Sequence, residues 1–324
     1  MTKMTYAQAV IEAQRYELRR DKDVLIIGED IAQLGGCFGL TAGLYDEFGS
    51  ERVINTPICE SGLTGMGVGL ALLGKRPIVE LMFADFAAYA YDSIANQAVK
   101  IRFETGGRWT MPLTIRAPQG AYTSAGATHS QCVEGWFQNI PALKIVVPST
   151  PADVYGLLKT AVRDDDTVLF LEHKALLGLK GEVPDKEDFT IPLGKARVVR
   201  EGKDVTIVAY QMMLRFAQVA AEQLAQEGIE AEIIDPRTIF PFDKVCLATS
   251  VEKTGRVLFV HESPLRGGVG GEMAAFVAEE CFGDLKAPVK RLGGADTFSV
   301  YNEQEAYAFP DDKQIVAMVK EIMG

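Results

Sequence analysis

The sequence predicts an α/β protein built from two domains, each an open parallel sheet with helices on both faces. First, apolar strands alternate with helical segments along nearly the whole chain. Second, runs such as DVLIIGED and DVTIVAY are continuously apolar, which is typical of parallel strands covered on both sides. Third, a chain of 324 residues more often divides into two domains than builds one core.

The first series of elements starts with the helix TYAQAVIEAQRYELRRD and the strand DVLIIGED. A glycine-rich loop, IAQLGGCFGLTAG, leads towards a helix that begins near Glu60. Next come the strand PIVELM, one long helix from about Phe86 to Glu104, and the strand PLTIRAP. The strand LKIVVPS, the helix PADVYGLLKTAVRDDD and the strand TVLFLEHK complete a β/α series that predicts a parallel sheet.

A polar segment with two prolines, beginning near residue 178, separates the two series. We therefore expect a first domain over residues 1–180, a linker over 181–195 and a second domain over 196–324. The second series contains the strands DVTIVAY, EAEIIDP, RVLFVHE and PVKRLGG with helices between them, and its sheet is again expected to be parallel.

Composition excludes several classes of function. The formal net charge of −11 and the pI near 4.9 argue against binding to nucleic acids or anionic membranes. The sequence contains neither an apolar run long enough to span a bilayer nor an N-terminal signal peptide, so we expect a cytoplasmic protein. Its five cysteines form no CxxC pair, which favours a reducing compartment over a zinc or disulfide framework.

Glu60 is the main candidate for chemistry. It lies in TPICESGLTGMGVGLALLG, where we expect it to be the only acid in dry surroundings, at the start of a helix buried on all sides. Glycines at 62, 65, 67 and 69 predict that another backbone or a flat ligand approaches this helix closely. Glu60 is then either a helix cap or a carboxylate that exchanges a proton with a ligand nitrogen.

Phe86 and His129 also follow predicted strands, where ligands of parallel sheets bind. Taken alone, Phe86 fits core packing equally well, and His129 fits a surface loop. His173 and His261, which end strands, are minor candidates. The glycine-rich loop lacks the strand, GxGxxG and helix order of a dinucleotide site, so we interpret it as an ordinary turn in preference to a ligand-lining loop. We interpret RGGVGGE as a tightly packed helix start in preference to a phosphate-binding loop.

Together, TPICE, RPIVELMFADF, THSQ, LKIVVPSTPADVYGLLKTAVRDDD, IDPRTIFPFD and HESPLRGGVGGE resemble the beta subunits of thiamine-diphosphate-dependent 2-oxo acid dehydrogenases. The resemblance runs from about Thr5 to the C-terminus, and FADF and EHK are most similar to acetoin dehydrogenase beta subunits. It implies a transketolase-like pyrimidine-binding domain followed by a transketolase C-terminal-like domain.

The resemblance also implies roles for single residues. Glu60 matches the glutamate that hydrogen-bonds the cofactor's aminopyrimidine nitrogen, and Phe86 matches the aromatic residue that packs on the pyrimidine face. His129 matches a histidine near the substrate, as proton donor or oxyanion partner. Cys59 and Thr128 replace a serine and a glutamine common in the family, beside these site residues, and are expected to affect substrate choice.

A potassium site is implied as well, formed largely by backbone carbonyls. Without the resemblance, the acidic residues 164–166 would read as a solvated helix end. Asp166 occupies a position where many family members have asparagine, and this difference affects the implied contact between residue 166 and the potassium ion. The residues implied for this site are Leu113, Ala161, Val162, Asp164 and Asp166.

This chain carries only part of the implied site. The family's Mg²⁺ and diphosphate are held by a GDG motif and a downstream NN pair on an alpha subunit, and this sequence contains no such set. We therefore expect an α2β2 heterotetramer that binds thiamine diphosphate between subunits, acts on a small-molecule substrate and docks a lipoyl acyltransferase core. The substrate is expected to be acetoin, with pyruvate or a branched-chain 2-oxo acid as the alternative. A non-catalytic nucleotide-binding or electron-transfer module is the alternative of another class.

Overall fold

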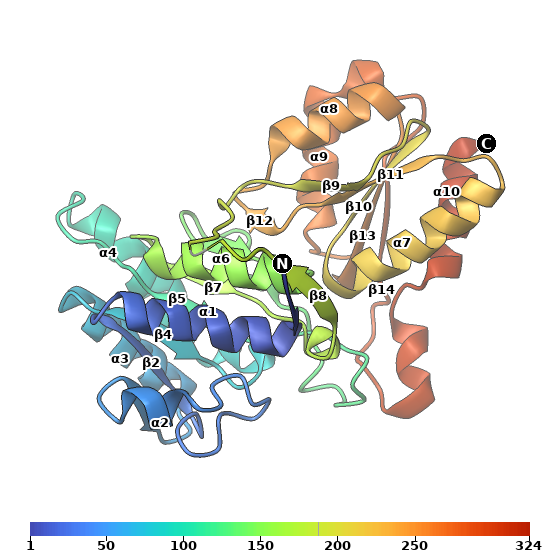
Figure 1. Ribbon diagram of the computed structural model, residues 1–324. Helices are drawn as coiled ribbons and strands as arrows, with labels where there is room; N and C mark the ends of the chain where they lie inside the picture. The colour runs from blue at the N-terminus through green and yellow to red at the C-terminus, as the bar shows by residue number, and fades with distance from the viewer. Residues whose placement is uncertain (187) are drawn as a thin grey trace. The chain divides into compact units, whose positions relative to one another are not determined.

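The computed structural model describes residues 1–186 and 188–324, so residue 187 of the predicted linker lies outside the described residues. The chain forms two compact units, each described by itself (Figure 1). The first unit contains residues 1–119 and 137–193, and the second contains 120–136 and 194–324. The segment 120–136 thus belongs to the second unit, a difference from the division expected at residues 181–195.

The main sheet of the first unit is parallel, as predicted. Its strands follow the order β6-β7-β5-β4-β2-β3, and each pairing between these neighbours is parallel. Most of their residues are buried, which explains the continuous apolar runs. The strands are β2 (Val24–Glu29), β3 (Val53–Thr56), β4 (Arg76–Glu80), β5 (Thr114–Arg116), β6 (Lys144–Val146) and β7 (Val168–Phe170).

Two helices of the first unit, α1 (Tyr6–Arg20) and α6 (Pro151–Arg163), pack side by side (Figure 1). Thr5 caps α1 in a capping box with Gln8, and Thr150 caps α6, whose first residue is a proline. Short elements complete the unit: α2 (Leu44–Phe48), the 3₁₀ turn η3 (Lys174–Leu176), and β1 (Thr2–Thr5) paired antiparallel with β8 (Lys180–Val183).

The long helix expected over 86–104 is broken into three pieces. It consists of the 3₁₀ helix η1 (Ala84–Ala88), the π-helix η2 (Ser93–Ala98) and α4 (Val99–Glu104). The carboxylate of Asp92 accepts hydrogen bonds from the side chains of Asn96 (2.7 Å) and Gln97 (3.4 Å), four and five residues on. Such spacing fits a widened turn, and π-turns of this kind often mark functional regions.

The second unit contains one sheet in the order β14-β13-β10-β11-β9. Four strands pair in parallel, but β9 pairs antiparallel with β11, so the expectation of a purely parallel sheet is wrong at this edge. An antiparallel edge strand on a parallel sheet is common. The strands of this sheet are β9 (Arg197–Arg200), β10 (Val205–Ala209), β11 (Ala231–Asp235), β13 (Val257–Pro264) and β14 (Lys290–Gly294). The short strand β12 (Thr238–Phe240) lies outside this sheet.

Helices cover both faces of this second sheet (Figure 1). Helices α7 (Gln211–Gln226) and α10 (Asp312–Met323) pack together with β10, β11 and β13 around a buried apolar core. Helices α8 (Lys244–Thr254) and α9 (Gly270–Glu280) lie on the other face. The remaining elements are α5 (Glu134–Phe137) and the 3₁₀ segments η4 (Phe282–Asp284) and η5 (Asn302–Ala308).

A buried ion network crosses the sheet of the first unit. The Arg116 side chain is fully buried and donates from Nη1 to Glu80 Oε2 (2.6 Å) and from Nε to Glu172 Oε1 (2.5 Å). Nη1 also donates to the side-chain oxygen of Gln14 on α1 (3.1 Å). Because a buried charge is tolerated only when it is paired, one guanidinium here holds two carboxylates from neighbouring strands.

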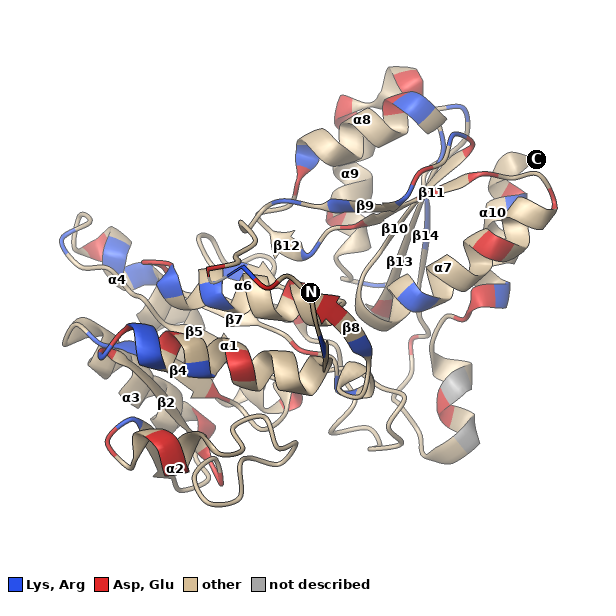
Figure 2. Ribbon diagram, viewed as in Figure 1, with Lys and Arg blue, Asp and Glu red and all other residues tan. Residues whose placement is uncertain are grey.

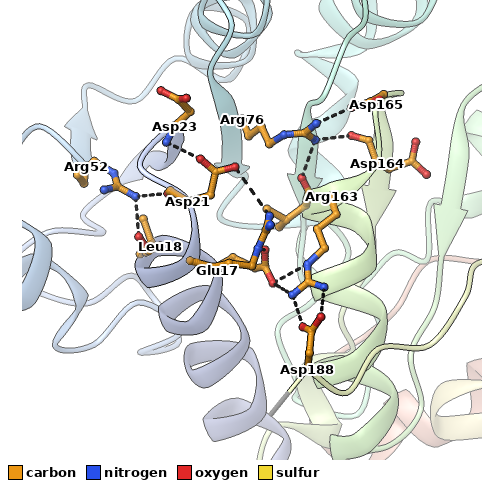
Figure 3. A network of polar contacts seen from close by, with 12 residues as sticks. Glu17, Leu18, Asp21, Asp23, Arg52, Arg76, Arg163, Asp164, Asp165 and Asp188 are labelled. Carbon is orange, nitrogen blue, oxygen red and sulfur yellow. Dashed lines mark hydrogen bonds and ion pairs between the residues drawn. The ribbon is translucent and has the colours of Figure 1, made fainter. Parts of the chain in front are cut away.

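Acidic and basic residues are interspersed on helices of both units, for example on α1 and α8 (Figure 2). In the first unit, the Arg163 guanidinium bridges Glu17 Oε1 (2.6 Å) and Asp188 Oδ1 (2.6 Å), which ties α1, α6 and the segment after β8 together (Figure 3). Within the described ranges, no helix has the length and apolarity needed to cross a membrane.

The motif RGGVGGE packs tightly around His261. A Cβ atom added at Gly268 would lie 2.3 Å from the His261 ring, and one at Gly270 or Gly293 would lie 2.8 Å from it. The ring is 1% exposed, and its Nδ1 lies 2.9 Å from the Ser263 carbonyl oxygen, to which it donates in the neutral tautomer. These glycines therefore make room for a buried imidazole, in agreement with the interpretation as a tightly packed helix start.

We expect His261 to make the fold sensitive to acid. Burial lowers the pKa of His261 to about 4 against an ordinary value of 6.5, although the Ser263 carbonyl opposes the shift. Between pH 6.5 and 4 the unfolded chain binds a proton at His261 that the folded chain does not bind. The free energy of unfolding therefore falls as the pH drops through this range, by up to about 3 kcal/mol. Thermal unfolding from pH 7.5 to 4.5 would measure this loss. His261→Asn should unfold earlier at pH 7.5 yet lose less on acidification, and an equal loss in both proteins would contradict the assignment.

Candidate functional site

Two carboxylates meet at the carboxyl edge of the first sheet. Glu29 ends β2 in register with Thr56 at the end of β3, and α3 (Glu60–Leu72) begins just beyond. Glu29 is 5% exposed, and burial, followed by the nearby charge of Glu60, raises its pKa, while the Cys59 backbone N–H lowers it. The expectation that Glu60 is the only acid in its surroundings is therefore wrong. The sequence signal for Glu29 was its position at the end of a buried strand.

Helix α3 is buried on one side only. Leu63, Gly67 and Val68 face the unit, and a Cβ at Gly67 would lie 2.6 Å from the Val79 side chain of β4. This glycine therefore serves close packing against side chains, whereas the sequence predicted the approach of another backbone or a flat ligand. The opposite side is bare, and the expectation of a helix buried on all sides is wrong for this chain alone. Glu60 itself is half-buried at the helix N-terminus, near the positive end of the helix dipole. The exposed apolar residues and glycines on and beside this helix include Ile58, Gly62, Gly65, Met66, Gly69, Leu72 and Leu73.

Phe86 belongs to an aromatic cluster in η1, just after β4. Its ring lies edge-on to Phe83 at a centroid distance of 5.7 Å, and Phe83 lies edge-on to Phe38 at 5.2 Å. Phe86 is half-buried, so it is not the fully enclosed core residue that packing alone would predict. Phe38 comes from the glycine-rich loop, which thus contributes to the candidate site although the sequence favoured an ordinary turn.

His129 belongs to the second unit, in the loop formed by residues 120–136. Its Nδ1 lies 2.9 Å from the Thr128 hydroxyl, and its backbone N–H donates to the Gly126 carbonyl (3.3 Å) in a tight turn. The imidazole is half-buried. The hydroxyl of Thr128 can fix the ring tautomer by donating to Nδ1 or accepting from it.

A cavity of about 260 Å³ lies beside this turn, within the second unit. It is found where β13 and β14 end, the edge of a parallel sheet at which ligands bind. Ala127 and Ser130 flank His129 in its wall, and the Ser130 hydroxyl is buried without a hydrogen-bond partner among the described residues. Further lining residues are Trp136, Glu262, Phe298, Ser299 and Phe309.

Two of the residues implied for potassium, Val162 and Asp164, direct backbone carbonyls at the guanidinium of Arg76, and Figure 3 shows Asp164 beside it. Arg76 Nη1 donates to the carbonyls of Val162 (3.2 Å) and Asp164 (3.1 Å) at the end of α6. The Ala161 carbonyl accepts from the Asp164 backbone N–H, and the Leu113 carbonyl accepts from Val168.

The side chain of Asp166 lies in the same region. Burial alone would raise its pKa, but Arg102 and Lys144 outweigh burial and lower it. Lys144 also donates to Asp164 Oδ1 at 2.7 Å. These acids are thus neutralised by cations, unlike the solvated helix end that the sequence alone would favour.

His173 and His261, the two minor candidates, are both buried and serve the fold. His173 is fully buried and accepts at Nδ1 from the Ala175 backbone N–H (3.3 Å), as the cap of η3. His261 is enclosed by glycines as described above.

Comparisons with known proteins agree with this architecture. Residues 2–180 match the transketolase pyrimidine-binding domain, and residues 194–315 match the transketolase C-terminal domain. The solved structure of a split-gene transketolase, an inactive beta4 tetramer, superimposes with a TM-score of 0.81 at 26% identity, covering 99% of this chain and 98% of that one.

Curated relatives give a narrower family. The chain is 48% identical to the 2-oxoisovalerate dehydrogenase subunit beta of Bacillus subtilis, over 91% of this chain and 90% of the relative. It is 40% identical to the pyruvate dehydrogenase E1 component subunit beta of the same organism, over 100% and 99% of the two chains. Such membership rules out the non-catalytic module considered from the sequence. The chain belongs to the family of beta subunits of thiamine-diphosphate-dependent 2-oxo acid dehydrogenases, with a transketolase-like fold.

Proposed function

We propose that this chain, together with an alpha subunit, forms an enzyme that cleaves acetoin, or decarboxylates a related 2-oxo acid, and passes the acyl group to lipoamide. The observation that carries the proposal is the pair of carboxylates, Glu29 and Glu60, at the edge of the first sheet beside the half-buried start of α3. Bound there, thiamine diphosphate would supply the carbon nucleophile and electron sink that break the bond next to a carbonyl group.

Glu60 exchanges a proton with the pyrimidine nitrogen in this proposal. A carboxyl group suits this task when a proton is retained near it at neutral pH. Glu29 supports this role, because it lies near Glu60 and its pKa is raised by burial and by the charge of Glu60.

Phe86 provides the flat apolar surface for the pyrimidine ring. Its edge-on contact with Phe83, and through it with Phe38, restricts the ring to one orientation. Stacking of this kind contributes about 1 kcal/mol beyond the burial of apolar surface. His129 is proposed to hold or donate a proton near the substrate, with its tautomer fixed by Thr128.

The alpha partner is proposed to cover the bare side of α3. An apolar surface that contains Leu73 (81% exposed), Ile58 (77%) and three outward glycines permits close backbone approach and is unusual for a monomer. The alpha subunit would also bring the groups that hold Mg²⁺ and the diphosphate, in an α2β2 assembly. Since the beta4 tetramer of the split-gene transketolase is inactive, we expect this chain alone to be inactive too.

Potassium is proposed to bind beside Arg76. The carbonyls of Val162 and Asp164 already converge on one positive group, and each retains a second lone pair. Oxygen donors of this type fit a hard monovalent cation. A cytoplasmic location and docking to an acyltransferase core complete the proposal.

Acetoin is the first candidate substrate, because the motifs FADF and EHK resemble those of acetoin dehydrogenase beta subunits. This resemblance stays a prediction. A branched-chain 2-oxo acid is the second, because the relative at 48% identity is named for 2-oxoisovalerate. Cys59, which precedes Glu60, and Thr128, which contacts His129, are proposed to influence this choice.

Reconstitution tests the proposal. The chain is co-expressed with an alpha subunit that carries GDG and NN motifs, and turnover of acetoin, pyruvate and 2-oxoisovalerate is measured with a lipoyl domain as acceptor. We expect activity only from the pair, with the highest kcat/KM for acetoin. A higher value for 2-oxoisovalerate would favour the second candidate, and failure of the two chains to co-purify would contradict the assembly.

A further inference from the structure

The loop that carries His129 has an unfavourable backbone. Tyr122 has a φ of 64° and Ser124 a φ of 54°, in the left-handed region that side chains other than glycine seldom adopt. Such a conformation is unfavourable and persists only where surrounding contacts hold it. The structure must therefore contain groups that keep this loop in place.

One such group is the Glu305 carboxylate, in η5. Its side chain is 4% exposed, and Oε2 accepts a hydrogen bond from the backbone N–H of Ser124 at 2.9 Å. Its other oxygen, Oε1, accepts from the Ser299 hydroxyl at 3.2 Å. Glu305 thus binds the backbone at a strained residue, and a charged acceptor makes a stronger hydrogen bond than a neutral one.

Tyr301 fixes a second point of the loop. A Cβ atom at Gly126 would lie 2.5 Å from the Tyr301 ring, and the φ of Gly126 is 78°. Only glycine fits this position, both for space and for backbone conformation. The Gly126 carbonyl in turn accepts from the backbone N–H of His129, so the Tyr301 ring rests on the turn that presents the imidazole.

Tyr122 fixes a third point. Its hydroxyl donates to the Pro310 carbonyl (3.2 Å), and its ring packs between Phe216 and Phe309, each at a centroid distance of 5.7 Å. Burial raises the pKa of Tyr122, so the phenol stays a donor at neutral pH. All of these contacts lie within the second unit, and all but Phe216 come from one stretch of chain, residues 299–310.

We propose that residues 299–310 hold the loop 120–131 in the conformation that presents His129, and that Glu305 is a positioning residue for the reaction. The inference rests on the proposed function, because it assigns Glu305 an effect on catalysis through His129. Ser299 and Phe309 of the same segment also line the cavity beside His129, so this segment shapes the surroundings of the imidazole as well as its backbone.

Hydrogen exchange tests the structural half of the proposal without any assay of activity. In Glu305→Ala, backbone amides of residues 120–131 should exchange about tenfold to a hundredfold faster, since a buried hydrogen bond to a charged group is lost. Glu305→Gln, which retains one oxygen acceptor, should show an intermediate increase. The matched control is Glu321→Gln on α10, whose partner is Lys290 (2.6 Å) and which should leave these amides unchanged. Unchanged exchange in Glu305→Ala would overturn the inference.

A double-mutant cycle on the reconstituted complex tests the catalytic half. Glu305→Ala should lower kcat about tenfold or more while the KM for thiamine diphosphate changes less than about twofold, because the proposed cofactor residues Glu60 and Phe86 belong to the first unit, whose own fold does not include Glu305. In a His129→Ala background the same change should cost little further, since both remove one function. Additive losses would overturn the positioning role. Full activity of His129→Ala would instead contradict the proposed function, while the exchange result would still stand.

Discussion

Glu60→Gln is expected to lower turnover of the reconstituted complex by about 10³-fold while the complex still assembles. Proton transfer by a positioned carboxyl group typically contributes 10²-fold to 10⁴-fold, and an amide of the same shape cannot exchange that proton. Glu60 is half-buried at the start of α3 rather than part of the core, so the fold should not depend on its charge. Steady-state rates, size-exclusion chromatography and calorimetric titration with thiamine diphosphate would separate these effects.

The control for this variant is Glu51→Gln, an exposed glutamate in the turn before β3. It removes the same charge from the same unit and should leave the rate unchanged. Glu29→Gln should give an intermediate loss, because it removes the buried carboxyl group that interacts electrostatically with Glu60. Wild-type turnover in Glu60→Gln would refute the proton role.

Arg116→Met is expected to destabilise the first unit by about 3–5 kcal/mol, the usual effect of removing one partner from a buried ion network. The change leaves the carboxylates of Glu80 and Glu172 buried and unpaired, at positions that are 5% and 0% exposed. Differential scanning calorimetry of the purified chain would record this as a lower Tm of one transition.

The dependence of this loss on pH identifies its cause. Burial already raises the pKa of Glu172 despite the opposing effect of Arg116, and without the guanidinium the pKa must rise further. Protonation then relieves the unpaired charge, so the deficit relative to wild type should shrink as the pH falls from 8 to 5. Arg116→Met combined with Glu80→Gln and Glu172→Gln should recover much of the Tm. A deficit independent of pH would indicate a packing defect instead of lost charge pairing.

The sequence predicted the two sheets well because their strands are short apolar runs of nearly uniform character. It missed β9 and β3, where RVVR and VINT carry little of this signal. The break in the helix predicted over residues 86–104 was also missed, since a π-turn depends on contacts such as that of Asp92 with Gln97, five residues further on.

The candidate site was predictable only in part. Glu60, Phe86 and His129 follow strands, and a rule on sheet edges finds them. Glu29 also ends a strand, but its nearness to Glu60 depends on the pairing of β2 with β3, which no local pattern encodes. Helix α3 was misjudged for another reason: an apolar sequence does not tell whether its own chain or a different one covers each side. Glu305 lies far along the chain from the loop that it holds, so nothing near either residue indicates the contact.

The bare side of α3 also bears on how cells must supply this protein. Copies made in excess of the alpha subunit would expose this apolar surface to each other and to chaperones. They would then be degraded or would aggregate. Matched synthesis of the two polypeptides, from adjacent genes or a shared transcript, would avoid that waste.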